Sequence, residues 1–270
     1  MVTRPAPLVV KLGGRALEAP GAPAELALDL STLVPGQPVV LVHGGGAEAT
    51  RWGERLGVPS RFHDGLRVTD PATLEIVVAV LAGLANKRLV AALRAGGVNA
   101  VGLSAADGVA DIEPHAEAAT LGEVGRVSQV DTAFLNEFLA QGRLPVLASV
   151  GAHRGKLLNI NADDLAAGVA GALGASLLVL LSDTPGLRLR AQLVERVDAD
   201  SIETLLAHPD VTGGMRPKLA AAAAAVRGGA AQAVIAAWDG PGTLAGLKAG
   251  APGGTFVEKA ATLATGGARD

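Results

Sequence analysis

Leu8-Val9-Val10-Lys11-Leu12-Gly13-Gly14 is an apolar segment that carries one lysine and ends in two glycines. An apolar run bounded by Gly-Gly is typical of a buried strand that ends in a loop without side chains. An unpaired ammonium is costly in such an interior, so Lys11 should have an anionic partner. A fixed cation beside bare glycine amides is the chemistry that binds phosphate. An edge strand from which Lys11 extends into solvent fits the segment equally well.

The composition is that of a globular protein of enzyme size. The chain has 270 residues, of which 49% are hydrophobic and 18% charged, enough for a large core. The formal net charge of -3 gives no indication of a nucleic-acid or anionic membrane partner. Because there is no cysteine, disulfides and thiolate metal sites are excluded. With no signal-peptide core and no uninterrupted apolar run of about 18 residues, we expect a cytoplasmic protein.

Expected strands and helices alternate along the chain. After the first strand, we expect strands at residues 39–42, 99–103, 144–150, 176–181, 232–236 and 254–257. Helices are expected at residues 25–33, 47–56, 72–94, 131–139, 162–173, 200–207 and 219–226, with hairpins within 105–130 and 187–194. This alternation predicts an α/β protein, a three-layer α/β/α sandwich with a mainly parallel open sheet. In such sheets ligands bind at the carboxyl ends of the strands.

The turn His43-Gly44-Gly45-Gly46 lies between an expected strand and an expected helix. Free N–H groups and the helix dipole favour anions at such a position. The same turn is similar to the oxyanion-hole motif of esterases, but the G-x-S-x-G elbow that those enzymes need is absent. A P-loop is also excluded, because Gly155-Lys156 is followed by leucine. We expect His43 itself to be structural and not catalytic.

Six motifs follow one another in an order that resembles the amino-acid kinase family. They are Lys11-Leu-Gly-Gly, His43-Gly-Gly-Gly, Gly65-Leu-Arg67-Val-Thr, Asn159-Ile-Asn161-Ala-Asp163, Ser182-Asp183-Thr-Pro-Gly186 and Gly213-Gly-Met215-Arg-Pro-Lys218. The resemblance extends from Leu8 to about Val257, and within the family it is to the members that act on N-acetyl-L-glutamate. It implies the amino-acid kinase fold, with residues 1–155 as a lobe for the acylamino acid and for dimerisation and residues 156–270 as a nucleotide-binding lobe.

The resemblance implies that ATP phosphorylates the side-chain carboxylate of N-acetyl-L-glutamate, the second step of arginine synthesis. Such a transfer depends mostly on positioning and charge neutralisation. Lys11 and Lys218 match the lysines that stabilise the transferring group from opposite sides, and Asp163 matches the carboxylate that holds both. Gly14 and Gly45 match the residues whose N–H groups bind the same oxygens.

The other implied contacts concern the two substrates. Arg67 matches the residue that binds the α-carboxylate of the acylamino acid, and Gly45, Gly46 and Asn159 match the rest of that site. The nucleotide contacts implied by the resemblance are Asp183, Thr184, Pro185, Gly186, Leu187, Asp210, Val211 and Thr212, with Met215 near the adenine. Mg²⁺ is expected on the phosphates and water, with no metal site formed by the protein. The implied assembly is a homodimer without nucleic acid or membrane partners.

Other interpretations of the same residues stay open at this point. Arg67 fits a surface ion pair, Asn159 a turn, Asp163 a helix N-cap and Lys218 a solvated helix face. Two other functions also fit: a sister kinase acting on carrier-protein-linked 2-aminoadipate or glutamate in lysine synthesis, and a sensor that keeps the fold without catalysis. Phosphoryl transfer to N-acetylglutamate would distinguish an N-acetylglutamate kinase from the sister kinase and from the sensor.

Overall fold

An eight-stranded sheet forms the centre of the computed structural model, which describes residues 4–13 and 21–260. Its strands, in spatial order, are β14 (Arg196–Asp198), β16 (Gly254–Glu258), β15 (Ala233–Ala237), β11 (Leu177–Ser182), β1 (Leu8–Leu12), β2 (Val39–His43), β8 (Leu144–Ala148) and β5 (Ala100–Ser104). Every neighbouring pair is parallel except β15–β16. The mainly parallel open sheet is therefore confirmed. Gly14 lies outside the described residues, so its expected role stays a prediction.

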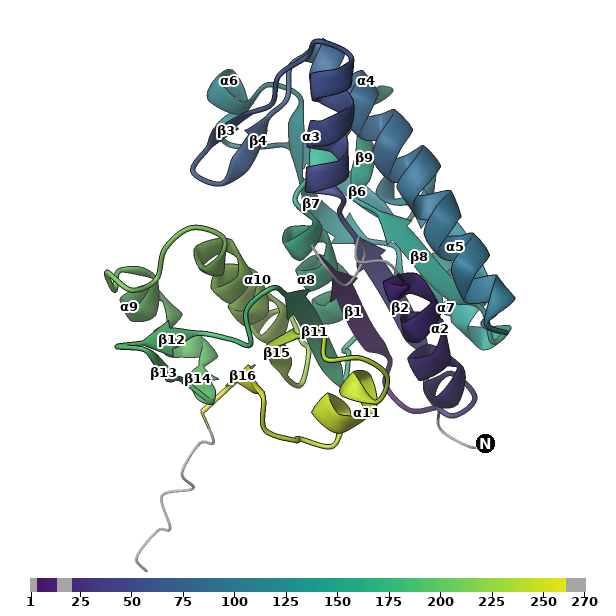
Figure 1. Cartoon of the computed structure of the whole chain (residues 1–270), viewed down its shortest axis with the longest axis vertical. Helices are drawn as coiled ribbons and strands as arrows, with labels where there is room; N and C mark the ends of the chain where they lie inside the picture. Colours follow the sequence, from purple (N-terminus) through teal and green to yellow (C-terminus); the bar gives the residue numbers. More distant parts are fainter. Residues whose placement is uncertain (1–3, 14–20, 261–270) are drawn as a thin grey trace, which may run out of the picture.

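Helices cover both faces of this sheet, which confirms the three-layer sandwich (Figure 1). On one face lie α2 (Ala22–Leu33), α5 (Asn86–Ala95) and α11 (Thr243–Lys248), and on the other lie α7 (Thr132–Ala140), α8 (Ala162–Ala172) and α10 (Met215–Arg227). Alternate residues of β1 divide between the two cores: Leu8, Val10 and Leu12 join the first, and Val9 joins the second. Since side chains alternate along a strand, Lys11 faces α8 and α10.

A smaller sheet and two hairpins lie around the carboxyl ends of the central strands. The smaller sheet has the order β6 (Ala110–Pro114), β7 (Val124–Val130), β10 (Lys156–Ile160) and β9 (Val150–His153). The hairpins are β3–β4 (Arg61–His63 and Leu66–Val68) and β12–β13 (Arg188–Leu189 and Gln192–Leu193), with α3 (Gly46–Arg55), α4 (Pro71–Val77), α6 (Ala118–Leu121) and α9 (Ile202–Leu206) nearby in Figure 1. The expected lobe boundary at residues 155 and 156 falls in the turn between β9 and β10. The division into lobes stays a prediction.

Three expected elements differ in the structure. The helix expected at residues 72–94 is continuous but changes type, with π-helical Val78–Ala85 between α4 and α5, and π-helical segments are frequent at functional sites. The strand expected at 144–150 divides into β8 and β9, which belong to different sheets. The helix expected from residue 219 begins at Met215, because Pro217 lies in its first turn, where no backbone N–H is needed.

Candidate active site

Lys11 and Lys218 converge on one carboxylate. Lys11 Nζ lies 2.9 Å from Asp163 Oδ1, and Lys218 Nζ lies 3.4 Å from Asp163 Oδ2. The side chains of Lys11 and Asp163 are 9% and 6% exposed, while that of Lys218 is 17% exposed. The structure thus gives Lys11 the anionic partner that its buried position requires, and it brings together residues that are far apart in the sequence.

Three elements of secondary structure hold this cluster. Lys11 lies near the end of β1, two residues before Gly13. A Cβ on Gly13 would lie 2.9 Å from Lys11 Nζ, so a side chain there would displace the ammonium. Asp163 lies in the first turn of α8, where the Asn161 side chain caps the helix by accepting from the Asp163 N–H at 2.8 Å. Lys218 lies in the first turn of α10, which packs against α8. The N-cap is thus Asn161, and Asp163 is left to face the lysines.

The charges of the cluster favour an additional anion. Burial raises the pKa of the Asp163 carboxyl, but the ammonium groups of Lys11 and Lys218 outweigh burial and hold that pKa below its usual range. Asp163 is therefore ionised at neutral pH. Two ammonium groups and one carboxylate leave an excess of positive charge, which a partly buried phosphoryl group would neutralise.

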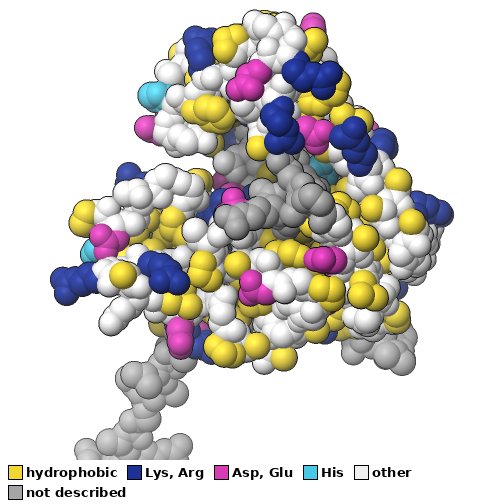
Figure 2. Space-filling model, in the orientation of Figure 1, with side chains coloured by type: hydrophobic (Ala, Val, Ile, Leu, Met, Phe, Trp, Pro, Cys, Tyr) yellow, Lys and Arg dark blue, Asp and Glu magenta, His cyan; other side chains and the backbone are white. Residues whose placement is uncertain are grey.

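A cavity of about 230 Å³ adjoins the cluster and contains most of the predicted substrate residues. Its lining includes Lys11, Gly45, Gly46, Arg67, Asn159 and Asp163, together with Phe62, Leu81 and Ser149. Figure 2 shows the surface hollowed between the part that carries the β3–β4 hairpin and the part that carries α9 and the β12–β13 hairpin. One cavity thus brings together Lys11, Arg67 and a glycine-rich turn, and Lys218 contacts Asp163 in its wall.

Arg67 is held in one orientation at this cavity. Its guanidinium donates to Ser60 Oγ, to the Gly46 carbonyl at 2.7 Å and to Thr50 Oγ1 at 2.8 Å. The same group lies over the Phe62 ring, 4.9 Å from its centroid. No carboxylate among the described residues forms an ion pair with Arg67. A guanidinium that is oriented by neutral acceptors keeps its charge for a ligand carboxylate.

Asn159 is oriented by Thr69, the last residue of the motif that contains Arg67, for which the sequence analysis predicted no contact. Asn159 Nδ2 donates to Thr69 Oγ1 at 3.0 Å, and Thr69 Oγ1 donates to the Arg67 carbonyl at 3.0 Å. Thr69 is fully buried, because its backbone pairs with the segment around Gly122. With its amide nitrogen engaged in this way, Asn159 can offer its Oδ1 as an acceptor to a ligand N–H group.

The residues predicted to contact the nucleotide do not line this cavity. Asp183, Thr184, Asp210 and Thr212 are exposed, Pro185 and Met215 are half-buried, and Gly186, Leu187 and Val211 are buried. Leu187 and Val211 belong to the core on the α8–α10 face. Gly186 packs so closely on Thr255 that a Cβ would lie 2.5 Å from Thr255 Oγ1.

Asp210 has a structural contact that the sequence did not predict. Its Oδ2 accepts from the Arg190 N–H at 2.7 Å, at the turn of the β12–β13 hairpin. Arg190 and Ala191 adopt positive φ values of 49° and 67° there, which is uncommon for side chains with a Cβ. Asp210 therefore stabilises this turn, while its contact with nucleotide stays a prediction.

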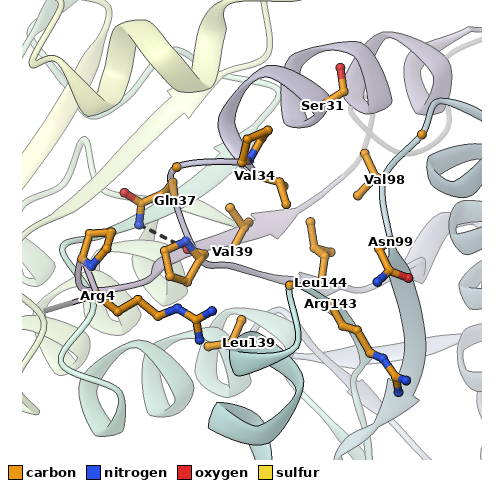
Figure 3. Close-up of a pocket in the computed structure, with 16 residues that line it drawn as sticks. Arg4, Ser31, Val34, Gln37, Val39, Val98, Asn99, Leu139, Arg143 and Leu144 are labelled. Carbon is orange, nitrogen blue, oxygen red and sulfur yellow. Dashed lines mark hydrogen bonds between the residues drawn. The ribbon is translucent and has the colours of Figure 1, made fainter. Parts of the chain in front are cut away.

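A second cavity, of about 550 Å³, lies at the amino ends of β2 and β8, the opposite end of these strands from the first cavity. Figure 3 shows Arg4 beside Leu139 and Arg143 pointing away from it, so the two guanidinium groups do not converge on one point. Gln37 in the same wall already donates to the carbonyls of Ala6 and Pro38. This cavity therefore lacks the focused charge of the first one.

Comparisons with known proteins show which family the chain matches. Residues 6–237 match the amino acid kinase family. The chain is 44% identical over 243 residues to acetylglutamate kinase of Methanopyrus kandleri, covering 86% of this chain and 95% of that protein. It is 42% identical over 258 residues to acetylglutamate kinase of Rubrobacter xylanophilus, covering 95% and 99%.

A solved structure is also similar over most of the chain. The N-acetylglutamate synthase of Neisseria gonorrhoeae, complexed with coenzyme A and N-acetyl-glutamate, superposes with a TM-score of 0.82 at 28% sequence identity. The match covers 95% of this chain and 60% of the synthase chain. The fold is thus similar to a domain within a longer protein as well as to kinases of similar length.

Proposed function

The chain belongs to the amino acid kinase family and is a kinase, and we propose that it transfers the γ-phosphoryl group of ATP to the side-chain carboxylate of N-acetyl-L-glutamate. The observation that carries the proposal is the pair of lysines on Asp163, 2.9 and 3.4 Å from its two oxygens. In this site they would neutralise the charge that spreads over the migrating phosphoryl group. The identity of 41–44% to acetylglutamate kinases over most of the chain supports the substrate.

The chemistry requires no general base. A carboxylate oxygen of the substrate attacks the γ-phosphorus, and the bond from that phosphorus to the β–γ bridging oxygen breaks, leaving its electron pair on ADP. A glutamate side chain has a pKa of about 4.3 and is ionised at neutral pH. Since no proton leaves the nucleophile, the site needs cations and N–H donors, and those are the groups that the cavity contains.

Arg67 and Asn159 would position the acylamino acid. The oriented guanidinium of Arg67 suits the α-carboxylate, and the Oδ1 of Asn159 suits the N–H of the acetamido group. This arrangement would direct the side-chain carboxylate toward the end of the cavity at Lys11 and Asp163. Gly45 and Gly46 would contribute backbone N–H groups at the start of α3, where the helix dipole favours an anion.

ATP would bind beside Lys218, along the loops of residues 182–187 and 210–215. Mg²⁺ would be held by the phosphates and water, because Asp163, the acidic residue of the cavity, is already engaged by both lysines. Among the described residues no group of three His, Asp or Glu side chains is placed to hold a metal ion. When bound, Mg²⁺ would neutralise phosphate charge.

We also propose a cytoplasmic homodimer. The helix Pro71–Ala95 is long enough and apolar enough to cross a membrane, and the core helix of a soluble protein passes the same test.

Residues 76–85 of this helix carry no charge, yet Val78, Ala82 and Leu84 are half-exposed and Ala79 is exposed. A second copy would cover this apolar face. In light scattering, we expect a dimer for the native chain and a monomer for Ala79→Glu; a native monomer would refute the proposal.

Coupled detection of ADP tests the activity. We expect release of ADP that depends on N-acetylglutamate, with little release in the presence of unacetylated glutamate or of carrier-linked 2-aminoadipate. A well-folded sample that binds ATP without any transfer would contradict the proposal and favour a sensor. Faster turnover of the carrier-linked substrate would assign the chain to the sister kinase.

A further inference from the structure

The imidazole of His43 is buried beneath the glycine turn of the proposed site. We infer that His43, through a hydrogen bond to the Gly44 carbonyl, sets the direction of the Gly45 N–H and so acts as a positioning residue for the transferred phosphoryl group. The inference rests on the proposed function. It concerns a motif residue that neither touches the cavity nor takes part in the chemistry described above.

His43 is the last residue of β2 and has no exposed surface. Its Nδ1 lies 2.8 Å from the Gly44 carbonyl oxygen, and its Nε2 lies 3.0 Å from Asn86 Nδ2. Asn86 is also fully buried and begins α5, directly after the π-helical segment. The ring thus connects the glycine turn to the long helix beneath it.

The contacts of Asn86 determine which ring nitrogen carries the proton. Asn86 Nδ2 lies 3.0 Å from the Val146 carbonyl and 3.3 Å from the Leu103 carbonyl, which only accept, and Asn86 Oδ1 lies 3.0 Å from Lys87 Nζ, which only donates. Asn86 Nδ2 must therefore donate to His43 Nε2, so the proton of the neutral ring is on Nδ1 and is donated to Gly44. Burial lowers the pKa of His43 to about 4, so the ring is neutral at physiological pH.

The peptide between Gly44 and Gly45 transmits this constraint to the cavity. The described chain has no cis peptide bond, and in a trans peptide the carbonyl and the N–H point in opposite directions. Because the carbonyl points to the buried ring, the Gly45 N–H points away from it, toward the cavity that the turn lines. Among the residues that the structure describes, no acceptor bonds to this N–H.

Leu81 packs close to the Cα of Gly45. Gly45 has a φ of 140°, and a Cβ there would lie 2.6 Å from Leu81 Cδ2. Glycine is thus required at this position, and a glycine peptide without a restraint can adopt several orientations. The histidine removes that freedom before the substrates bind, which is the property that makes a backbone N–H effective toward charge that develops in a transition state.

Three substitutions at position 43 test the inference. His43→Leu fills the space without a donor, His43→Gln places its amide near the Nε2 position, and His43→Asn places its amide near the Nδ1 position. We expect kcat to fall roughly 10- to 100-fold in the Leu and Gln variants, with KM for both substrates nearly unchanged. The Asn variant should recover most of the loss.

Two further measurements distinguish positioning from a loss of structure. Affinity for MgADP with aluminium fluoride and N-acetylglutamate, a mimic of the transition state, should fall by the same factor as kcat, while affinity for MgADP alone stays unchanged. ¹⁵N spectra of the native protein should show the proton of His43 on Nδ1 from about pH 5.5 to 8. His153→Leu is the matched control, because His153 Nδ1 also bonds a carbonyl, that of Ile112 at 2.6 Å, but away from the cavity.

Several results would overturn the inference. Equal kcat in the Asn and Gln variants would contradict it, even if the Leu variant failed to fold. So would a native kcat in the Leu variant, or a proton on Nε2. Turnover by the native enzyme is measured first: its absence would refute the proposed function, and the inference with it, whereas its presence leaves only the comparison of variants to decide about His43.

Discussion

The cavity at Lys11 and the loops at residues 182–187 and 210–215, the two regions proposed to bind the substrates, are built differently. At the cavity, charged and polar side chains are buried or half-buried and are oriented by partners from distant parts of the chain, as with Asn159 and Thr69. At the loops, the buried residues Leu187 and Val211 belong to the core, and the polar residues Asp183 and Thr212 are exposed. The side proposed for the acylamino acid is therefore more preorganised than the side proposed for the nucleotide.

This difference indicates which region would determine kcat and the recognition of N-acetylglutamate, and which would determine the affinity for ATP. A preorganised cavity holds its charges in place and needs little rearrangement during the reaction. Exposed loops can adapt to a nucleotide, whose phosphates and Mg²⁺ supply part of their own binding geometry. We therefore expect cavity substitutions to affect kcat or the KM for N-acetylglutamate, and loop substitutions to affect the KM for ATP.

The largest expected effect comes from removing one ammonium of the cluster. Lys11→Ala or Lys218→Ala should lower kcat by about 10²–10³-fold, the order found for losing one preorganised donor in an active site. The KM values should change far less, because the charge acts on the transition state. Steady-state kinetics with both substrates measure this.

An exposed lysine provides the control for that experiment. Lys248 lies at the end of α11, away from the cavity, and Lys248→Ala should leave both kcat and KM unchanged. If Lys11→Ala raised only the KM values, the ammonium would bind the ground state and the proposed role would be wrong.

The next effect is on the free energy of unfolding and concerns His43, which is buried beneath the glycine turn. The pKa of His43 is lowered by burial from 6.5 to about 4 in the folded chain, so the unfolded chain binds a proton first as the pH falls. Stability from the neutral ring is complete above pH 6.5 and is lost between pH 6.5 and 4. As the pH falls from 8 to 5, the protonation of His43 in the unfolded chain should lower the free energy of unfolding by about 2 kcal/mol.

Urea unfolding of the native chain and of His43→Asn measures this loss. The variant retains the carboxylates and the other histidines but has no titrating group at position 43. We expect the native chain to lose about 2 kcal/mol more than the variant between pH 8 and pH 5. Identical pH dependences would show that His43 is not buried as a neutral ring.

A smaller effect tests how the cavity recognises the acylamino acid. Thr69→Val keeps the shape of the side chain but removes the hydrogen bonds to Asn159 Nδ2 and the Arg67 carbonyl. At about 1 kcal/mol for each of the two lost bonds, the KM for N-acetylglutamate should rise by up to about 30-fold, while that for ATP stays unchanged. Thr69→Ser keeps the hydroxyl and should remain close to native. Equal changes in both KM values would refute separate recognition.

The smallest expected effect lies on the nucleotide side. Thr255 is fully buried, accepts from the Leu187 N–H at 2.8 Å and donates to the Val194 carbonyl at 2.6 Å. Thr255→Val would loosen the loop that contains Leu187, and we expect the KM for ATP to rise by a factor of about three to ten. Measured with both substrates, an equal rise in the KM for N-acetylglutamate would remove the distinction between the two regions.

The parts of the fold that depend on local sequence could be predicted. The apolar run of β1, the glycines after β2 and the start of α8 each lie within a few residues, and the structure contains all three elements. The convergence of Lys11, Asp163 and Lys218 was implied by the resemblance to the amino-acid kinase family, and the structure brings these side chains together. The roles assigned to them stay predictions until activity is measured.

The parts that depend on contacts between distant residues could not be predicted. Thr69 is buried because its backbone pairs with the segment at Gly122, and no pattern near Thr69 indicates that pairing. The sequence also gave no sign that Asp210 would bond to the Arg190 N–H, since an aspartate in a polar loop fits a ligand contact equally well. The π-helical segment likewise follows from tertiary packing, because residues 78–85 have an ordinary helical composition.

A crystal structure with MgADP, aluminium fluoride and N-acetylglutamate tests the central claim most directly. We expect the aluminium between the nucleotide and the side-chain carboxylate, with Lys11 Nζ and Lys218 Nζ both within hydrogen-bonding distance of its fluorides and with Asp163 still contacting both lysines. A complex in which either ammonium points away from the fluoride, or in which N-acetylglutamate binds outside the cavity at Arg67, would contradict the account.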